Sequence, residues 1–201
     1  MIKKITIPIF PLNGVIFFPN TDLPLNIFEE KYLEMVDFAL TQNKIIGMIQ
    51  LKKNGDLYSK GCLGKITSYN ETEDRRYLIN IKGENIFSIV KEIKSGYQFK
   101  IAEVNIRYEH INENDSENIN TDLLLNKFYY LIKRKNISID FNLLKNIETS
   151  VLIKFIAMSG PFSPLEKQML LETISLKQLY DKLILLFEFY SNQNKENNLI
   201  N

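Results

Sequence analysis

The spacing of apolar residues changes once along this chain, and that change constrains the fold more than any other feature. Up to about residue 108, apolar residues occur in short runs or at every second position, as at Ile5, Ile7 and Ile9. Alternation with period two is typical of β-strands. After the polar stretch 112–120, apolar residues recur at spacings of three and four, which is typical of helices. The sequence therefore predicts an α+β chain with the strands first.

The same change sets the expected division of the 201 residues. Residues 111–120 are rich in Asn, Asp and Glu, and residues 191–201 are equally polar. Neither segment can bury enough apolar surface to fold by itself. We therefore expect a β-rich subdomain at 1–110, a linker at 111–120, a helical subdomain at 121–190 and a flexible tail at 191–201.

Short strands bounded by turn residues dominate the first part. The candidates are Val15–Phe18, Ile45–Leu51, Cys62–Tyr69, Tyr77–Lys82, Ile86–Ile93 and Tyr97–Tyr108. Strands at this spacing favour a small barrel or sandwich, because closure hides sheet edges. One helix interrupts them, with apolar residues from Phe28 to Leu40. Asn26 is its expected N-cap, with Glu29 as the capping-box partner.

Capping signals mark the helices of the second part. Apolar periodicity predicts helices around 124–132 and 151–158. Ser163 with Glu166, and Ser175 with Gln178, have the spacing of capping boxes, and Pro164 suits a first helical position. We expect these helices to form a bundle.

The residue inventory leaves little room for catalysis. The chain has one cysteine, Cys62, one histidine, His110, and a net charge of +1. This excludes an internal disulfide and a multi-cysteine zinc site, and it argues against nucleic acid as a partner. His110 reads as an exposed loop residue, and Gly61–Ile66 lacks the spacing and hydroxyl of a phosphate loop. We expect no enzyme activity, no catalytic residue, no cofactor and no metal.

Targeting signals are absent from the pattern as well. Prolines interrupt the apolar run near the first residues, and no small-residue cleavage site follows it. No apolar run reaches the roughly 18 residues that a transmembrane helix needs. The sequence predicts a cytoplasmic protein that does not enter a membrane.

Residues 7–32 form the most distinctive segment, with Pro8, Pro11, Pro19 and Pro24 beside large apolar side chains. Proline cannot donate to a strand ladder, so such strands lie at sheet edges or break repeatedly. Apolar side chains on irregular edges can line a groove that accepts a peptide. The residues alone favour the other interpretation, a core folded through kinked strands.

This segment resembles the start of the Lon protease N-terminal, substrate-binding domain. The residues that carry the resemblance are Pro8-Ile9-Phe10-Pro11-Leu12, Phe18-Pro19 and Leu23-Pro24-Leu25-Asn26-Ile27-Phe28-Glu29-Glu30-Lys31-Tyr32. It continues through Ile46–Ile49, Gly61–Ile66, the strands around Tyr77–Phe87 and the capped helix Ser163–Thr173, so it covers nearly the whole chain. The resemblance implies a PUA-like β pseudobarrel with one inserted helix, followed by a helical bundle.

The resemblance also implies a function. Members of this family recognise damaged or unfolded polypeptides, and full Lon proteases add ATPase and peptidase modules, for which these residues carry no phosphate loop. We therefore expect a non-enzymatic, stand-alone module that binds exposed apolar segments of other proteins, as an adaptor for a protease or chaperone in quality control. The expected contact residues are Phe10, Leu12, Phe18, Leu25, Phe28 and Tyr32. RNA binding is the alternative, because PUA-like barrels elsewhere bind nucleic acid.

The predicted division can be tested by brief proteolysis of the folded protein. Polar segments without a core are cleaved first, so the earliest cuts should fall within 112–120 and beyond residue 191. Mass spectrometry of the fragments locates the cuts. First cuts between residues 20 and 100 would show that the boundary is misplaced.

Overall fold

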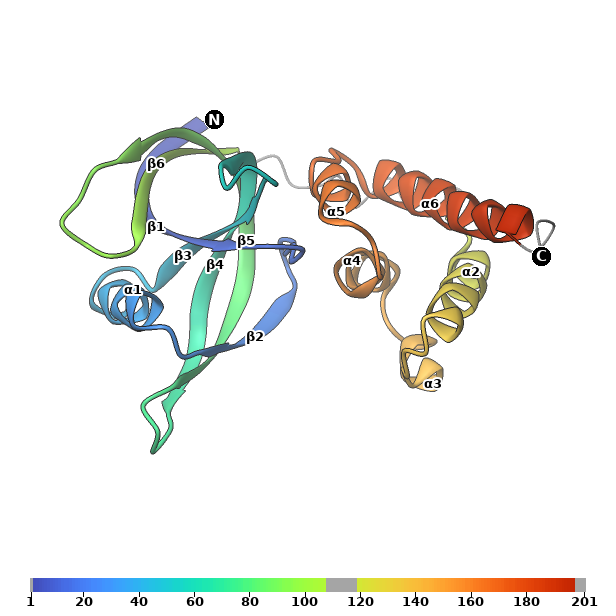
Figure 1. The fold of residues 1–201 in the computed structure, drawn as a ribbon, viewed down its shortest axis with the longest axis horizontal. Coiled ribbons are helices and arrows are strands. Elements are labelled where there is room, and N and C mark those ends of the chain that lie inside the picture. The colour runs from blue at the N-terminus through green and yellow to red at the C-terminus, as the bar shows by residue number, and fades with distance from the viewer. Residues whose placement is uncertain (1, 108–118, 198–201) are drawn as a thin grey trace. The chain divides into compact units, whose positions relative to one another are not determined.

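The computed structural model describes residues 2–107 and 119–197. The chain divides into two compact units, Met1–His110 and Ile111–Asn201. His110 and most of the segment predicted as a linker lie outside the described residues. Figure 1 shows the strands in the first unit and a set of helices in the second. The chain is therefore strand-rich first and helical second, as the change in periodicity predicts.

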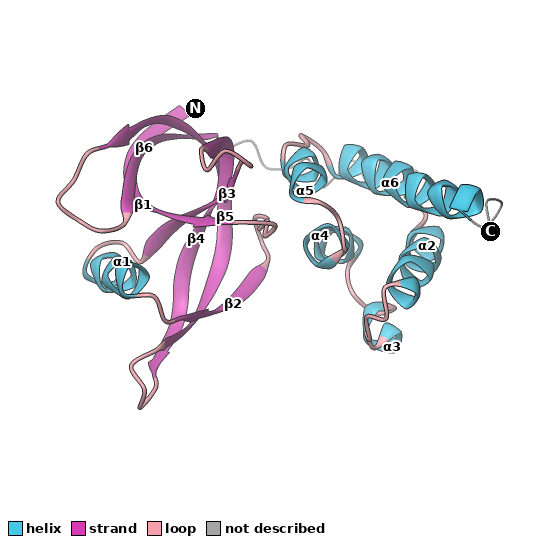
Figure 2. Cartoon of the chain, in the orientation of Figure 1, coloured by secondary structure: helices cyan, strands magenta, loops and turns pink. Residues whose placement is uncertain are grey.

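Six strands and one helix build the described part of the first unit (Figure 1). They are β1 (Ile2–Leu12), β2 (Asp22–Ile27), α1 (Glu30–Thr41), β3 (Ile45–Leu51), β4 (Leu57–Glu71), β5 (Tyr77–Ile93) and β6 (Lys100–Arg107). The sheet order is β2-β5-β4-β3-β1-β6, and β5 also pairs with β6. These pairings close β5, β4, β3, β1 and β6 into a ring, and β2 lies outside it on β5 (Figure 2). The first unit is thus a closed barrel with one added strand.

Strand β5 joins the ring to the added strand. Its first part, Tyr77–Lys82, pairs with β2, whereas Phe87–Ile93 pairs with β6. We predicted two strands here, and the structure corrects this to one. Gly83 lies between the two predicted strands, and a side chain there would meet the backbone of Phe18, since its Cβ would lie 2.0 Å from the Phe18 carbonyl oxygen. Glycine permits this close approach without ending the strand.

The prolines fit the ladders because each lies where one side of its strand is free. In β1, residues 2–9 pair with β6 and residues 9–12 with β3, so Pro8 and Pro11 each have a ladder neighbour on one side. Pro24 lies in β2, which pairs with β5 alone among the described strands. Proline is tolerated at such positions because its missing N–H can face away from the ladder.

The segment Val15–Phe18 is irregular, and the predicted strand there is wrong. Ile16, Phe17 and Phe18 are buried, yet the backbone makes a turn instead of a ladder. The Thr21 hydroxyl donates to the Phe18 carbonyl at 2.7 Å. The Gly83 amide then donates to the Thr21 carbonyl at 2.8 Å, which fastens the turn to β5. The apolar run therefore indicates that these side chains are buried, and not that their backbone pairs as a strand.

Helix α1 begins later than the sequence predicts. Its N-cap is Glu29, which makes no side-chain capping hydrogen bond. Asn26, the expected N-cap, is a residue of β2 and pairs with Leu78. The strand takes precedence because its pairing with β5 extends to Ile27. The helix buries Met35, Val36 and Ala39.

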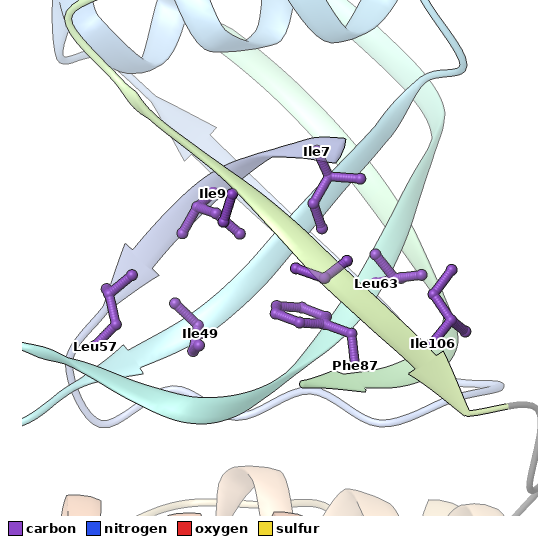
Figure 3. Packing of buried hydrophobic residues seen from close by; sticks show 9 residues of the cluster. Ile7, Ile9, Ile49, Leu57, Leu63, Phe87 and Ile106 are labelled. Carbon is purple, nitrogen blue, oxygen red and sulfur yellow. The ribbon is translucent and has the colours of Figure 1, made fainter. Parts of the chain in front are cut away.

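The interior of the barrel is aliphatic around one phenylalanine ring (Figure 3). The cluster consists of Ile7, Ile9, Ile49, Leu57, Leu63, Phe87, Ala102, Val104 and Ile106. A Cβ on Gly61 would lie 2.6 Å from the Phe87 ring, so the absence of a side chain there makes room for that ring. Every strand of the closed ring contributes to this core, which makes it the common support of the unit.

Five helices form the part of the second unit that the structure describes. They are α2 (Thr121–Arg134), α3 (Phe141–Leu144), α4 (Thr149–Ser159), α5 (Pro164–Leu171) and α6 (Leu176–Asn197). Helix α6 contacts α2, α4 and α5. Among the described residues, no helix has the length and apolar character needed to cross a membrane.

The capping predictions for this unit are partly correct. Ser163 and Glu166 form the reciprocal capping box of α5, with bonds of 2.7 and 3.3 Å. At α6 the backbone N–H of Gln178 donates to Ser175 Oγ. The side-chain oxygen of Gln178, however, accepts from the backbone N–H of Ile174, so the second box is not reciprocal.

The predicted start of the tail is also corrected. Helix α6 continues past 191 to Asn197, and no glycine or proline interrupts residues 176–197. The Tyr190 hydroxyl donates to Glu166 at 2.8 Å, which holds this part of α6 to α5.

Replacement of Gly83 should destabilise the barrel. Gly83→Ala places a Cβ against the Phe18 backbone, and we expect a loss at the upper end of about 1–3 kcal/mol in the free energy of unfolding. Chemical denaturation measures it. Gly96→Ala is the matched control, because nothing lies within 4 Å of a Cβ there. Equal stabilities of the two variants would contradict the close approach.

Candidate functional site

The six residues expected to contact a peptide have very different environments. Phe10 and Phe18 are buried in the core. Leu12, Leu25 and Tyr32 are half-buried. Phe28 is 65% exposed, and it lies in the link between β2 and α1.

Phe10 and Phe18 are structural residues, which corrects their predicted role. The Phe10 ring meets the Tyr32 ring edge-on, with centroids 4.6 Å apart, and this contact ties β1 to α1. Phe18 has no exposed surface and supplies the carbonyl of the turn to Thr21. Neither side chain can touch a partner while the barrel stays closed. The interpretation as core holds for these two phenylalanines.

Phe28 lies at the end of three paired strands where other large side chains are exposed. Ile27, the residue before it, pairs with Tyr77 of β5, and Tyr77 pairs with Glu71 of β4. Tyr69 of β4 is 56% exposed, and its ring lies 6.2 Å from that of Tyr77. Leu78 is also exposed. We call Phe28, Tyr69, Tyr77 and Leu78 the strand-end surface.

The two faces of the sheet both contribute to this surface. Neighbouring residues of a strand point to opposite faces, so Tyr77 and Leu78 lie on different sides. Tyr77 is on the side of α1, because its hydroxyl donates to Asp37 Oδ1 at 2.8 Å. A chain that contacts all four residues must therefore cross the end of the sheet.

The charges around this surface are mainly acidic. The acidic residues of segments 28–37 and 69–78 are Glu29, Glu30, Glu34, Asp37, Glu71, Glu73 and Asp74, whereas the basic ones are Lys31, Arg75 and Arg76. Lys31 pairs with Glu29 at 2.9 Å, which raises the pKa of the lysine, and Arg76 pairs with Asp74 at 2.5 Å. The local field disfavours a polyanion.

The outer edge of β2 is a poor template for another strand. A free edge can add a strand from a partner through its backbone groups. Pro24 removes one donor from the middle of β2, and an edge proline turns its nitrogen outward. A partner is therefore better bound at this end of the barrel through exposed side chains than through the backbone of β2.

Sequence reasoning missed Tyr69, Tyr77 and Leu78, which it treated as ordinary strand residues. Tyr69 and Tyr77 flank a charged turn, Glu71–Arg76. Two aromatic residues on either side of such a turn come together once the hairpin forms. That flanking pattern is the signal that could have located them.

The described residues contain no group of three His, Cys, Asp or Glu side chains placed to hold a metal ion. Cys62 is buried in β4, and its thiol lies 3.5 Å from the Leu63 carbonyl. The segment Gly61–Ile66 is part of β4, as its interpretation as a strand predicted.

Aromatic and aliphatic side chains that are exposed together at one end of a closed β barrel are a feature of binding domains. Comparison with known proteins identifies the family. Residues 6–188 match the family model described as the ATP-dependent protease La (LON) substrate-binding domain, and the chain belongs to that family.

Relatives are found among the Lon proteases. The chain is 28% identical to the Lon protease of Dictyoglomus thermophilum over 185 residues, which cover 88% of the chain and 23% of that protein. The Lon protease of Flavobacterium johnsoniae is 27% identical over 186 residues, which cover 87% of the chain and 23% of that protein. The chain thus spans about a quarter of these relatives.

Two solved structures share the fold. The Lon N-terminal domain protein from Xanthomonas campestris aligns with a TM-score of 0.63 and 17% identity, covering 92% of this chain and 98% of that one. The N-terminal domain of Mycobacterium avium complex Lon protease aligns with a TM-score of 0.67 and 16% identity, covering 91% and 98%. At this identity the likeness concerns the fold alone.

The bond between Tyr77 and Asp37 should appear in the alkaline stability of the protein. The bond to Asp37, together with burial, raises the pKa of Tyr77 from 10.0 to about 12. Its contribution to stability is complete below pH 10 and is lost as the pH rises toward about 12, because the unfolded state releases the proton first. Tyr77→Phe should therefore flatten the fall of melting temperature in this range.

Thermal melts at a series of pH values measure the effect. Tyr130→Phe is the control, because the Tyr130 side chain makes no hydrogen bond within the described part of the chain, and it should follow the wild type. A Tyr77→Phe curve that overlays the wild-type curve contradicts the role of the bond.

Proposed function

We propose that this chain is a non-catalytic module that binds exposed apolar segments of unfolded or damaged polypeptides through the strand-end surface. Membership in the substrate-binding domain family supports a polypeptide as the ligand. The choice of site rests on one observation. Phe28 is 65% exposed, and it lies just after β2 in the segment 7–32, which carries the resemblance to Lon N-terminal domains. A large apolar side chain that is kept in solvent suits contact with an apolar partner.

The wider role follows from the relatives. Because the relatives are proteases, we propose that the chain presents clients to a protease or chaperone in cytoplasmic quality control. The ring of β5, β4, β3, β1 and β6 supports a PUA-like pseudobarrel as its architecture. The acidic surroundings of Phe28 count against RNA at this surface.

The separation of core from contact residues gives a direct test. Phe28→Ala should weaken binding to an unfolded polypeptide several-fold and leave the melting temperature within a few degrees of wild type, because its ring is exposed. Phe18→Ala should instead lose about 3–5 kcal/mol of stability, because its ring is buried. Fluorescence anisotropy with labelled, reduced and carbamidomethylated lysozyme measures binding.

Leu165→Ala is the matched control. Leu165 is 68% exposed, comparable to Phe28, and belongs to the helical unit. Its removal should leave binding of the unfolded lysozyme unchanged. Equal losses for Phe28→Ala and Leu165→Ala would sink the assignment of the strand-end surface.

A further inference from the structure

The helical unit has its own unevenly distributed charges. Almost every acidic side chain described there has a partner within the unit: Asp140, Glu148, Glu166, Glu172, Asp181 and Glu188 each accept a hydrogen bond or an ion pair. Asp122, in the first turn of α2, is the exception. Asp181 and Glu188 are neutralised by lysines, whereas the other four carboxylates are held in place by neutral hydrogen-bond donors of their own helices and loops.

The basic side chains follow a different pattern. Lys127 and Lys177 have acidic partners, and Lys167 and Lys182 donate to backbone carbonyls. Lys133, Arg134 and Lys135 form no ion pair within the described residues, and Lys133 instead lies over the Tyr129 ring at 5.6 Å. Three consecutive cations without an ion pair among the described residues therefore lie together where α2 ends. The nearest acidic residue in sequence, Asp140, is engaged as the N-cap of α3.

Exposed apolar side chains lie on the same helix and on α3, the helix that follows it. Tyr130 is 66% exposed and lies one helical turn before Arg134, as Tyr129 lies one turn before Lys133. Leu143 of α3 is 69% exposed. Helix α3 lies beside the later end of α2 (Figure 1), and the Phe141 ring packs against Tyr129 at 5.0 Å. We call Tyr129, Tyr130, Lys133, Arg134, Lys135 and Leu143 the basic helix-end surface.

Helix electrostatics account for only part of this surface. The negative end of the helix dipole favours cations in the last turn. The dipole does not explain why a tyrosine and a leucine of the same surface are exposed. Burial of these two side chains, or their replacement by polar residues, would remove apolar surface from contact with water. Three unpaired cations with apolar neighbours complement a ligand that carries negative charge and apolar groups together.

We propose that the basic helix-end surface binds acidic, apolar-containing segments of polypeptide clients. The proposal rests on the proposed function, since it assigns a second class of segment to the same module. The acidic strand-end surface favours neutral or basic apolar segments, and the basic helix-end surface takes the segments that the first surface repels. Single-stranded nucleic acid is the competing ligand, and its stacking on tyrosine would be the distinguishing chemistry.

Two fluorescein-labelled peptides test the proposal on the full chain. One alternates Glu with Leu and Phe, and the other alternates Lys with Leu and Phe. The triple variant Lys133→Gln, Arg134→Gln, Lys135→Gln should bind the acidic peptide about tenfold more weakly and the basic peptide unchanged. Tyr130→Ala should also weaken binding of the acidic peptide. Binding of the acidic peptide to wild type should fall as salt rises.

The control triple variant is Lys53→Gln, Lys91→Gln, Lys94→Gln, which makes the same change in net charge at exposed lysines of the barrel. It should keep full affinity for the acidic peptide. Equal losses in the two triple variants, or no loss in either, overturn the proposal. Loss of polyuridylate binding in the helix-end variant, with the acidic peptide unaffected, overturns it in favour of nucleic acid.

The same peptides separate this proposal from the proposed function. If Phe28→Ala leaves binding of the basic peptide intact while the helix-end variant still loses the acidic one, the strand-end site fails and the helix-end site stands. If Phe28→Ala weakens the basic peptide and the helix-end variant keeps the acidic one, the strand-end site stands and this proposal fails.

Discussion

The barrel depends on the double pairing of β5. One part of this strand pairs with β2 and another with β6, while β4 runs along much of its length. A single 17-residue strand therefore both closes the ring and carries the outer strand. The change from one neighbour to the other falls beside Gly83, where the Phe18–Thr21 turn is hydrogen-bonded to β5. These hydrogen bonds hold the turn on β5, and the apolar segment before β2 is therefore kept buried.

This arrangement also determines what the strand-end surface can be. Because the register of β2 on β5 brings Ile27 opposite Tyr77, the link that holds Phe28 must leave the sheet beside the tyrosine pair. Two of the strands that carry the surface, β4 and β5, belong to the closed ring, and the third, β2, is paired with β5, so the backbone of the surface is supported by the aliphatic core. A rigid scaffold of this kind lowers the ordering cost of capturing a flexible chain. Its specificity then comes from side chains and their charge.

The sequence allowed the order of strands and helices, the Ser163 capping box and the family to be predicted, because local periodicity and short motifs carry them. It failed where tertiary contacts overrule local signals. Asn26 has the chemistry of an N-cap, but strand pairing with Leu78 takes it. The expected strands Tyr77–Lys82 and Ile86–Ile93 are one strand, in which Gly83 permits the approach of Phe18. Of the six expected contact residues, Phe10 and Phe18 proved to be core, since apolar character alone does not distinguish a groove from an interior. The strand-end tyrosines escaped notice because their proximity needs the β4–β5 register.

The position of β1 has a consequence for how the protein is made. Its residues pair with β6, from Ile2 opposite Arg107 to Ile9 opposite Lys100. During synthesis, the first strand leaves the ribosome long before its partner exists, and contacts so distant in sequence form slowly. Until then the nascent chain displays Ile5, Ile7 and Ile9 as an apolar extended segment. For that interval this segment has the same apolar, extended character as the clients that we propose for the folded protein.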